Sequence, residues 1–169
     1  MNEYSVWLIP AEPWLVRFRK IIENISKENN TPSFEPHITI LIKNDEEEKM
    51  ISVVEQLAKQ ISKPVSKLTQ IDHETSYFRA LYIKAEKQKL FEAHMLARKF
   101  VGMLADPYYL PHLSLLYGNM NENIKKNIIK NLDVKLPMDV EFDRITLWRT
   151  GVDIPVSEWK KVVDIQCQK

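Results

Sequence analysis

The stretch Pro36-His37-Ile38-Thr39-Ile40 returns in the second half of the chain as Pro111-His112-Leu113-Ser114-Leu115. Each copy has a proline, then a histidine, and a hydroxyl residue two places after the histidine. The apolar residues between them give an alternation that is typical of a β-strand, in which successive side chains point to opposite faces. The histidine and the hydroxyl residue of each copy therefore share one face, while Ile38 and Leu113 point into the core.

The residues on these two faces suit proton transfer beside a phosphoryl group. His37 and His112 carry imidazoles, which gain and lose a proton near neutral pH. Thr39 and Ser114 carry hydroxyls that can hydrogen-bond a phosphoryl oxygen. Two copies that face each other would place one base and one acid on either side of a phosphorus atom. We predict that the two segments are the paired halves of one metal-independent phosphoesterase active site.

A third histidine tests how selective this pattern is. His73-Glu74-Thr75 also has a hydroxyl residue two places after a histidine, but the polar residues Asp72 and Ser76 flank it. Such a composition is typical of a turn or a strand end, and we expect His73 on the surface. The preceding proline and the alternating apolar residues occur only in the two quoted segments. The fourth histidine, His94, lies in an expected helix and is interpreted as a packing or surface residue.

Hydrophobic periodicity predicts strands and helices whose order repeats. The landmarks Tyr4 and Tyr77 stand nearly as far apart as the two motif histidines, which indicates an internal duplication. Two similar halves packed about a pseudo-twofold axis would bring the motif strands together at a central groove. The expected strands are residues 4–9, 37–43, 67–71, 77–85, 112–117, 142–149 and 161–166, and the expected helices are residues 13–27, 45–62, 88–104 and 121–131.

Length and composition narrow the classes of function. The chain has 169 residues with 44% hydrophobic content, enough for one domain with a core of its own. Its 24 basic residues nearly balance its 23 acidic residues, so the net charge of +1 provides no general field for a long nucleic acid. Only three glycines occur, which excludes a Gly-rich phosphate loop and requires that side chains build any phosphate site.

The cysteine count and the first residues indicate a reducing compartment. The one cysteine, Cys167, excludes an internal disulfide and a Cys-rich zinc site. Two motif histidines fall short of the three or four protein ligands that are typical of zinc, so we expect no metal and no cofactor. The N-terminus lacks a basic region and an apolar run long enough for a signal peptide or a membrane span. We therefore expect a cytoplasmic protein.

With these residues the chain resembles the two-histidine (2H) phosphoesterase superfamily, and within it the cyclic phosphodiesterases of the plant and fungal type. The similarity extends over nearly the whole chain, and the run Pro111–Tyr117 (PHLSLLY) is specific. The matching residues are Tyr4-Ser5-Val6-Trp7, Pro10, Pro36–Thr39, Phe78, Pro107-Tyr108, Pro111–Tyr117, Arg144, Leu147, Thr150 and Trp159.

The resemblance implies an α+β fold with two lobes. Two pseudo-symmetric antiparallel-sheet lobes with outer helices would surround a central groove, in agreement with the repeat. The chain would form a single 2H phosphoesterase domain over residues 1–169, and its halves, roughly 1–75 and 76–169, would be intertwined.

The resemblance also implies an activity, the hydrolysis of ribose cyclic phosphates to a phosphomonoester. The substrates would be 2′,3′-cyclic nucleotides or ADP-ribose 1″,2″-cyclic phosphate. The family pattern carries over to His37 and His112 as the acid/base pair, and to Thr39 and Ser114 as donors to the phosphate. Following the family, His112 would deprotonate the attacking water and His37 would protonate the departing ribose oxygen.

Three further residues match family positions that contact the substrate. Tyr117 is expected near the phosphate, although it lies three residues after Ser114 and thus on the opposite strand face unless the strand bends. Trp7 and Phe78 match aromatic residues that line the groove and can stack on a base, while most strand aromatics belong to the core. Other residues that could contact the substrate, to which the sequence assigns no role, are Arg79, Tyr109, Trp148 and Arg149.

Two other functions stay open from the sequence. One is a 2′,5′-phosphodiesterase or RNA-end processing enzyme, for which residues 17–20 and Lys125-Lys126 would provide a basic track. The other is a non-catalytic nucleotide-binding module that keeps the groove without the chemistry. The expected partner is a small nucleotide with a cyclic phosphate, or an RNA end, and not a membrane, and we expect the protein to be a monomer.

Overall fold

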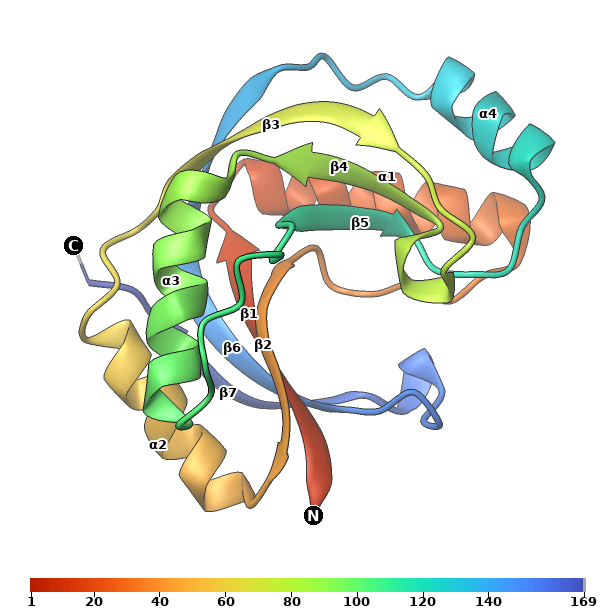
Figure 1. Ribbon diagram of the computed structural model, residues 1–169. Helices are drawn as coiled ribbons and strands as arrows, with labels where there is room; N and C mark the ends of the chain where they lie inside the picture. The colour runs from red at the N-terminus through yellow and green to blue at the C-terminus, as the bar shows by residue number, and fades with distance from the viewer. Residues whose placement is uncertain (169) are drawn as a thin grey trace.

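A computed structural model describes residues 1–168 as an antiparallel sheet with helices packed outside it (Figure 1). The strands are β1 (Asn2–Pro10), β2 (Ile38–Asp45), β3 (Val65–Asp72), β4 (Leu81–Ala85), β5 (His112–Leu116), β6 (Met138–Thr150) and β7 (Lys160–Gln166). The helices are α1 (Trp14–Asn29), α2 (Glu47–Ala58), α3 (Lys87–Phe100) and α4 (Glu122–Asn131), with short 3₁₀ turns η1 (Tyr77–Arg79) and η2 (Val156–Glu158). The predicted α+β class is confirmed.

The seven strands form one sheet with the order β1-β2-β5-β4-β3-β6-β7, and every neighbouring pair runs antiparallel. An additional pairing of β1 with β6 closes the first six strands of this order into a ring. The resemblance implied two antiparallel-sheet lobes, but two pairings join all the strands into one sheet. β2 meets β5 at the single pair Ile38 and Leu113, and β3 meets β6 over residues Val65–Leu68.

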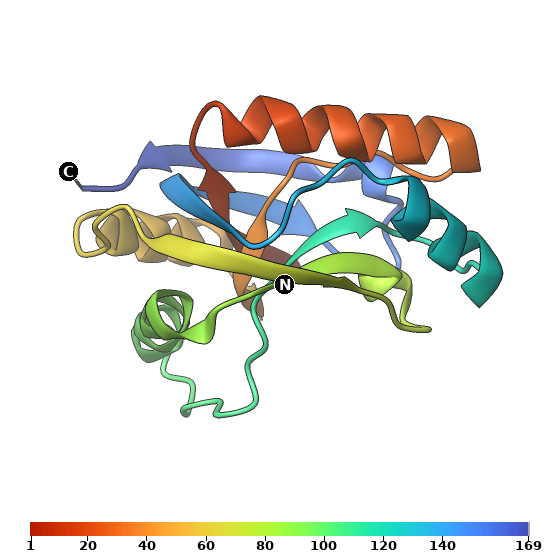
Figure 2. The ribbon, with the colours of Figure 1, turned by 90° about the horizontal axis from the view of Figure 1, so that it is seen from above.

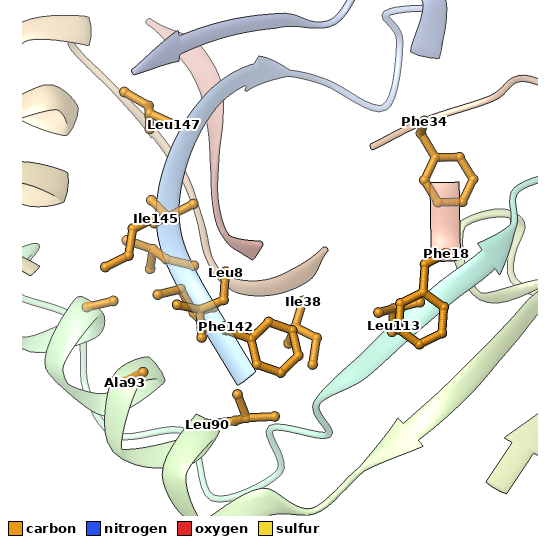
Figure 3. Close-up of a cluster of buried hydrophobic side chains, with 14 of the residues drawn as sticks. Leu8, Phe18, Phe34, Ile38, Leu90, Ala93, Leu113, Phe142, Ile145 and Leu147 are labelled. Atoms are coloured by element: carbon orange, nitrogen blue, oxygen red, sulfur yellow. The ribbon is translucent and has the colours of Figure 1, made fainter. Parts of the chain in front are cut away.

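The contact between the two motif strands lies in the hydrophobic core. Ile38 and Leu113 have no exposed area and belong to one cluster with Leu8 and Phe142. Figure 3 shows these side chains together with Leu90 of α3. Burial of each Ile or Leu side chain contributes about 1.5–3 kcal/mol. The apolar residue between histidine and hydroxyl therefore fixes the two motifs against each other.

The helices cover the sheet with amphipathic faces. α1 packs against β1 and β5, α2 against β6 and β7, and α3 against β2 and β3. In α1 the buried residues Leu15, Phe18, Ile22 and Ile25 follow the helical period. Seen from above, α1 and α3 lie on opposite sides of the strands (Figure 2). Among residues 1–168, no helix combines the length and apolar character needed to cross a bilayer.

The strand expected over residues 77–85 is a strand only from Leu81 onward. Its first residues form η1, in which Arg79 N donates to Ser76 O, while Gly118 N donates to Tyr77 O at 3.0 Å. The turn takes Phe78 out of the strand alternation. Aromatic composition favoured a strand here, but the backbone partner at residue 118 is distant in sequence and could not be identified from local pattern.

The third helix ends at Phe100, earlier than expected. Gly102 has a φ of 67° and donates to Lys99 O, while Met103 donates to Arg98 O. This pair of hydrogen bonds is the Schellman motif, which ends a helix at a residue in the left-handed region. The chain beyond it then runs alongside β2 before it enters β5 (Figure 1).

Candidate active site

The two motif histidines occupy equivalent positions at the meeting point of β2 and β5. His37 immediately precedes β2, and His112 is the first residue of β5. The residues that follow them, Ile38 and Leu113, are the one pair that joins the two strands. Because the pairing is antiparallel, the two histidines lie on opposite sides of this pair along the strands, with His37 toward Ser114 and His112 toward Thr39. His37 is 5% exposed, whereas His112 is half-buried.

Both imidazoles are held in the same way. His37 Nδ1 lies 2.6 Å from the carbonyl oxygen of Glu35, and His112 Nδ1 lies 2.9 Å from that of Leu110. A carbonyl oxygen only accepts, so Nδ1 is the nitrogen that carries the proton in each neutral ring. Nε2 then keeps a lone pair and is the nitrogen available for proton transfer. The two motif histidines are thus oriented by equivalent hydrogen bonds.

The two hydroxyl residues lie in the same cavity as the histidines. Thr39 is half-buried, and its carbonyl oxygen accepts a hydrogen bond from Tyr109 Oη at 2.8 Å. Ser114 is buried, and its hydroxyl donates to the carbonyl oxygen of Phe78 at 3.1 Å. Rotation about the Ser114 side chain would redirect this hydroxyl toward a ligand in the cavity.

Tyr117 reaches the site because β5 ends at Leu116, which releases the tyrosine from the strand alternation. Its hydroxyl lies 3.4 Å from His37 Nε2. Its ring stacks on Phe34 with centroids 3.7 Å apart. Burial raises the pKa of the Tyr117 phenol, so it stays protonated and able to donate a hydrogen bond. The end of β5 thus explains how Tyr117 reaches the cavity although strand alternation would place it on the face opposite Ser114.

Trp7 lines the cavity, but it is only 2% exposed. Its ring stacks on His37, with centroids 3.6 Å apart and an interplanar angle of 8°, and on Trp148 at 4.7 Å. With these contacts and so little exposed area, the ring offers little surface on which a base could stack, although the resemblance implies that role. Trp7 supports the imidazole of His37 instead.

Phe78 differs from Trp7 because it is half-buried and lines the cavity from η1. Its ring packs on Trp159 at 5.8 Å and edge-on against Tyr117 at 5.2 Å. Trp159 also lines the cavity. The sequence signalled Trp159 only through the family resemblance, because a lone tryptophan near the end of the chain has no local pattern that distinguishes a site residue from a core residue.

All seven predicted site residues line one cavity of about 620 Å³. This volume lies within the range of small-molecule sites. Within residues 1–168, no three His, Cys, Asp or Glu side chains come together as metal ligands would. The residues predicted for the site are His37, Thr39, His112, Ser114, Tyr117, Trp7 and Phe78.

Burial lowers the pKa of both motif histidines, and it does so more strongly at His37. It lowers the pKa of His37 to about 3, and the neighbouring His112 adds to this effect. Burial also lowers the pKa of His112, and the Arg79 guanidinium adds to it, while Glu74 acts in the opposite direction. Both rings are therefore neutral in the free protein at neutral pH. The imidazolium is disfavoured most strongly at His37.

A charged group beside His112 was not identified from the sequence. Glu74 accepts a hydrogen bond from Tyr82 Oη at 2.9 Å and pairs with Arg79 Nη2 at 2.6 Å. The Tyr82 ring meets His112 edge-on at 5.2 Å. His73, by contrast, is absent from the residues that line the cavity. The short motif match around His73 thus marks a turn whose glutamate, and not its histidine, approaches the site.

The fold and the paired histidines define a phosphoesterase of the two-histidine class. The family model described as "Cyclic phosphodiesterase-like protein" matches residues 1–166. The chain belongs to this family, and it is a homologue of phosphodiester hydrolases.

Known proteins show the same relationship. The chain is 27% identical to "Cyclic phosphodiesterase" of Arabidopsis thaliana, over 94% of this chain and 92% of that protein. Its fold is similar to TT0787 of Thermus thermophilus, with a TM-score of 0.62 and 14% identity, over 97% of both chains. It is also similar to Escherichia coli LigT complexed with 3′-AMP, with a TM-score of 0.61 and 11% identity, over 99% of both chains.

Proposed function

We propose that this protein hydrolyses ribose cyclic phosphates, either 2′,3′-cyclic nucleotides or ADP-ribose 1″,2″-cyclic phosphate, to a phosphomonoester. One observation carries the proposal. Two imidazoles line one cavity on either side of the pair Ile38 and Leu113, and each has Nδ1 on a backbone carbonyl, so that Nε2 carries the lone pair. Such a pair can remove a proton from water and deliver one to a leaving oxygen in the same displacement.

The roles of the two histidines follow from their burial. A general acid must carry a proton before the reaction, and this costs more at His37, which is enclosed and packed on Trp7. His37 therefore acts as the base toward water, and His112 protonates the departing ribose oxygen. This reverses the assignment that the resemblance implied, in which His112 is the base and His37 the acid.

The hydroxyl residues bind the phosphoryl oxygens on which negative charge accumulates. Thr39 and Ser114 donate to these oxygens, after the Ser114 hydroxyl rotates away from the Phe78 carbonyl. Tyr117 donates from the side of His37. A donor that points at an oxygen where negative charge develops contributes about 10²–10³ in rate. Phe78 and Trp159 provide the aromatic surface for a base.

The relatives support a nucleotide substrate. The Arabidopsis thaliana protein is named a cyclic phosphodiesterase, and LigT is described in complexes with 3′-AMP and with ATP. A 3′-monophosphate is one of the two products that opening of a 2′,3′-cyclic phosphate can give. A small ligand also agrees with the near-balance of charges in the sequence.

We also propose that the chain works as one monomeric domain over residues 1–169 with intertwined halves. Strand β3 of the first half pairs with β4 and β6 of the second, and β1 pairs with β6. Separation of the halves near residue 75 would break these pairings. Each half alone would expose unpaired strand edges and core side chains.

The function is tested by incubation of the protein with each of the four nucleoside 2′,3′-cyclic phosphates and separation of the 2′- and 3′-monophosphates. We expect turnover to a single monophosphate isomer. Hydrolysis of a 2′,5′-linked dinucleotide without turnover of cyclic phosphates would favour the alternative phosphodiesterase. Tight nucleotide binding without any product would favour a non-catalytic module.

A further inference from the structure

The cavity offers little positive charge to a ligand that carries a phosphate. The two motif imidazoles are neutral at neutral pH, and among residues 1–168 the basic side chains that line the cavity are Arg79 and Arg98. Arg98 lies on α3, and its Nε donates to the carbonyl oxygen of Leu104. Arg79 lies in η1, beside the end of β5 (Figure 1), and its charge influences the pKa of His112. Arg79 is therefore the cation of the motif region.

The backbone of Arg79 lies beside a predicted phosphate donor. Ser114 Oγ donates at 3.1 Å to the carbonyl oxygen of Phe78, the residue immediately before Arg79. Gly118 N donates to the carbonyl oxygen of Tyr77 at 3.0 Å, which holds η1 against the end of β5. Arg79 itself lines the cavity together with Ser114. A long, forked side chain that starts at this place can reach a phosphoryl group bound at Ser114.

Glu74 holds one nitrogen of the guanidinium and leaves the others accessible. Arg79 Nη2 lies 2.6 Å from Glu74 Oε2, while Glu74 Oε1 accepts a hydrogen bond from Tyr82 Oη at 2.9 Å. Glu74 does not line the cavity, so it holds Arg79 from outside. A guanidinium has five N–H donors, and the Arg79 side chain is 37% exposed. Donors therefore remain available to a ligand in the cavity.

The turn that carries Arg79 is fixed without the ion pair. Glu74 N donates to the carbonyl oxygen of Arg79 at 3.1 Å and closes the turn. Lys125 of α4 is only 1% exposed, and its ammonium donates to the carbonyl oxygen of Glu74 at 2.7 Å. Burial of an ammonium is tolerated only where it is hydrogen-bonded, so this contact is a fixed one. Because a partly exposed ion pair adds little to stability, the Glu74 carboxylate mainly orients the guanidinium.

We propose that Arg79 is a phosphate-binding residue whose guanidinium donates to a phosphoryl oxygen of the substrate on the side of His112 and Ser114. The proposal rests on the proposed function, since it takes the cyclic phosphate to lie between the two motif histidines. A cyclic phosphate diester carries one negative charge, and the phosphomonoester product carries up to two at neutral pH. Hydroxyl donors do not neutralise this charge. A guanidinium does, and it can contact two phosphoryl oxygens at once.

Calorimetric binding of 3′-AMP tests Arg79 without any need for turnover. We expect Arg79→Gln to weaken this binding about 10–10²-fold, because a hydrogen bond between two charged groups is lost. Arg79→Lys keeps the charge but not the planar fork, so it should weaken binding less. The lysine variant also gives the comparison if circular dichroism shows that Arg79→Gln does not fold. Unchanged affinity in Arg79→Gln, or no measurable binding to the unmodified protein, would overturn the proposal.

Lys84→Gln is the matched control for loss of a positive charge. Lys84 is the register partner of His112 on β4, and its ammonium pairs with Asp72 as Arg79 pairs with Glu74. Its side chain is 43% exposed, but it does not line the cavity. Because salt screens an exposed charge that makes no contact with the ligand, 3′-AMP affinity should change less than about twofold. Equal losses in Lys84→Gln and Arg79→Gln would indicate a general field and overturn the direct contact.

Turnover separates failure of the Arg79 contact from failure of the proposed hydrolysis. With a nucleoside 2′,3′-cyclic phosphate, kcat/KM of Arg79→Gln should fall about 10²-fold, because negative charge increases on the phosphoryl oxygens during the reaction. If the unmodified protein hydrolyses no cyclic phosphate, the proposed function fails, and the 3′-AMP affinities alone decide the role of Arg79. If it hydrolyses cyclic phosphates and Arg79→Gln keeps a normal kcat/KM, the proposed function stands and the Arg79 contact is overturned.

Discussion

The indole of Trp7 lies parallel to the imidazole of His37, with ring centroids 3.6 Å apart. The indole therefore packs flat against one face of the imidazole. It fixes the ring plane, and together with the Glu35 carbonyl it sets the direction of Nε2. Burial of His37, to which this contact contributes, is the main cause of the low pKa of this histidine.

Replacement of Trp7 by leucine removes the flat surface under His37. We expect kcat to fall about 10²-fold, because a small misplacement of the base is enough for such a loss. We also expect the His37 pKa to rise toward 6.5, as measured from its ring signals in an NMR titration. Trp14→Leu, a change in a partly buried tryptophan of α1, serves as the control and should alter neither quantity. An unchanged His37 pKa in Trp7→Leu would refute the supporting role.

The two motif histidines should be individually indispensable. His37→Ala and His112→Ala are each expected to lower kcat by about 10²–10⁴, because each removes one proton-transfer step. His73→Ala is the matched control, since His73 has the same short sequence pattern but lies outside the cavity lining. Turnover is measured with a nucleoside 2′,3′-cyclic phosphate, and the fold by circular dichroism. Near-normal turnover in either motif variant would remove the proposed mechanism.

Much of this site could be predicted from strand alternation. The proline, the alternating apolar residues and the repeat selected His37 and His112 over His73, and the structure brings the two selected histidines together in one cavity. Strand alternation failed to predict the orientation of a side chain where the backbone leaves the strand. Phe78 lies in a 3₁₀ turn, beside the hydrogen bond from Gly118 N to Tyr77 O. Tyr117 does not follow the alternation of β5 because the strand ends at Leu116.

The sequence could not identify residues that contact a motif histidine, or its neighbours, from another part of the chain. The residues around Glu74 are typical of a surface turn. Only the fold shows that its carboxylate contacts Tyr82 and Arg79 close to His112. Trp7 matched a groove position, yet nothing local to it predicts that His37 and Trp148 would cover its ring. Periodicity predicts the face of the strand or helix on which a side chain lies. It does not predict which side chain of another element packs against it.

Stability should depend on pH through His37. Its pKa is about 3 in the folded protein and about 6.5 in the unfolded chain, so the unfolded state binds more protons between these values. The contribution of His37 is fully present above pH 6.5 and declines by about 1.4 kcal/mol for each pH unit below it, down to about pH 3. Urea unfolding at about pH 7 and about pH 5 should show a smaller difference in His37→Asn than in the unmodified protein. Equal differences would contradict the low pKa.

A substrate with a better leaving group can show which histidine is the acid and which is the base. A general acid is required only when the leaving group is poor, so replacement of the leaving ribose oxygen by sulfur makes protonation unnecessary. With this thio-substituted cyclic phosphate, His112→Ala should recover most of the activity it loses on the normal substrate. His37→Ala should recover little, because water still has to be deprotonated. The opposite recovery would restore the family assignment, in which His37 is the acid and His112 the base.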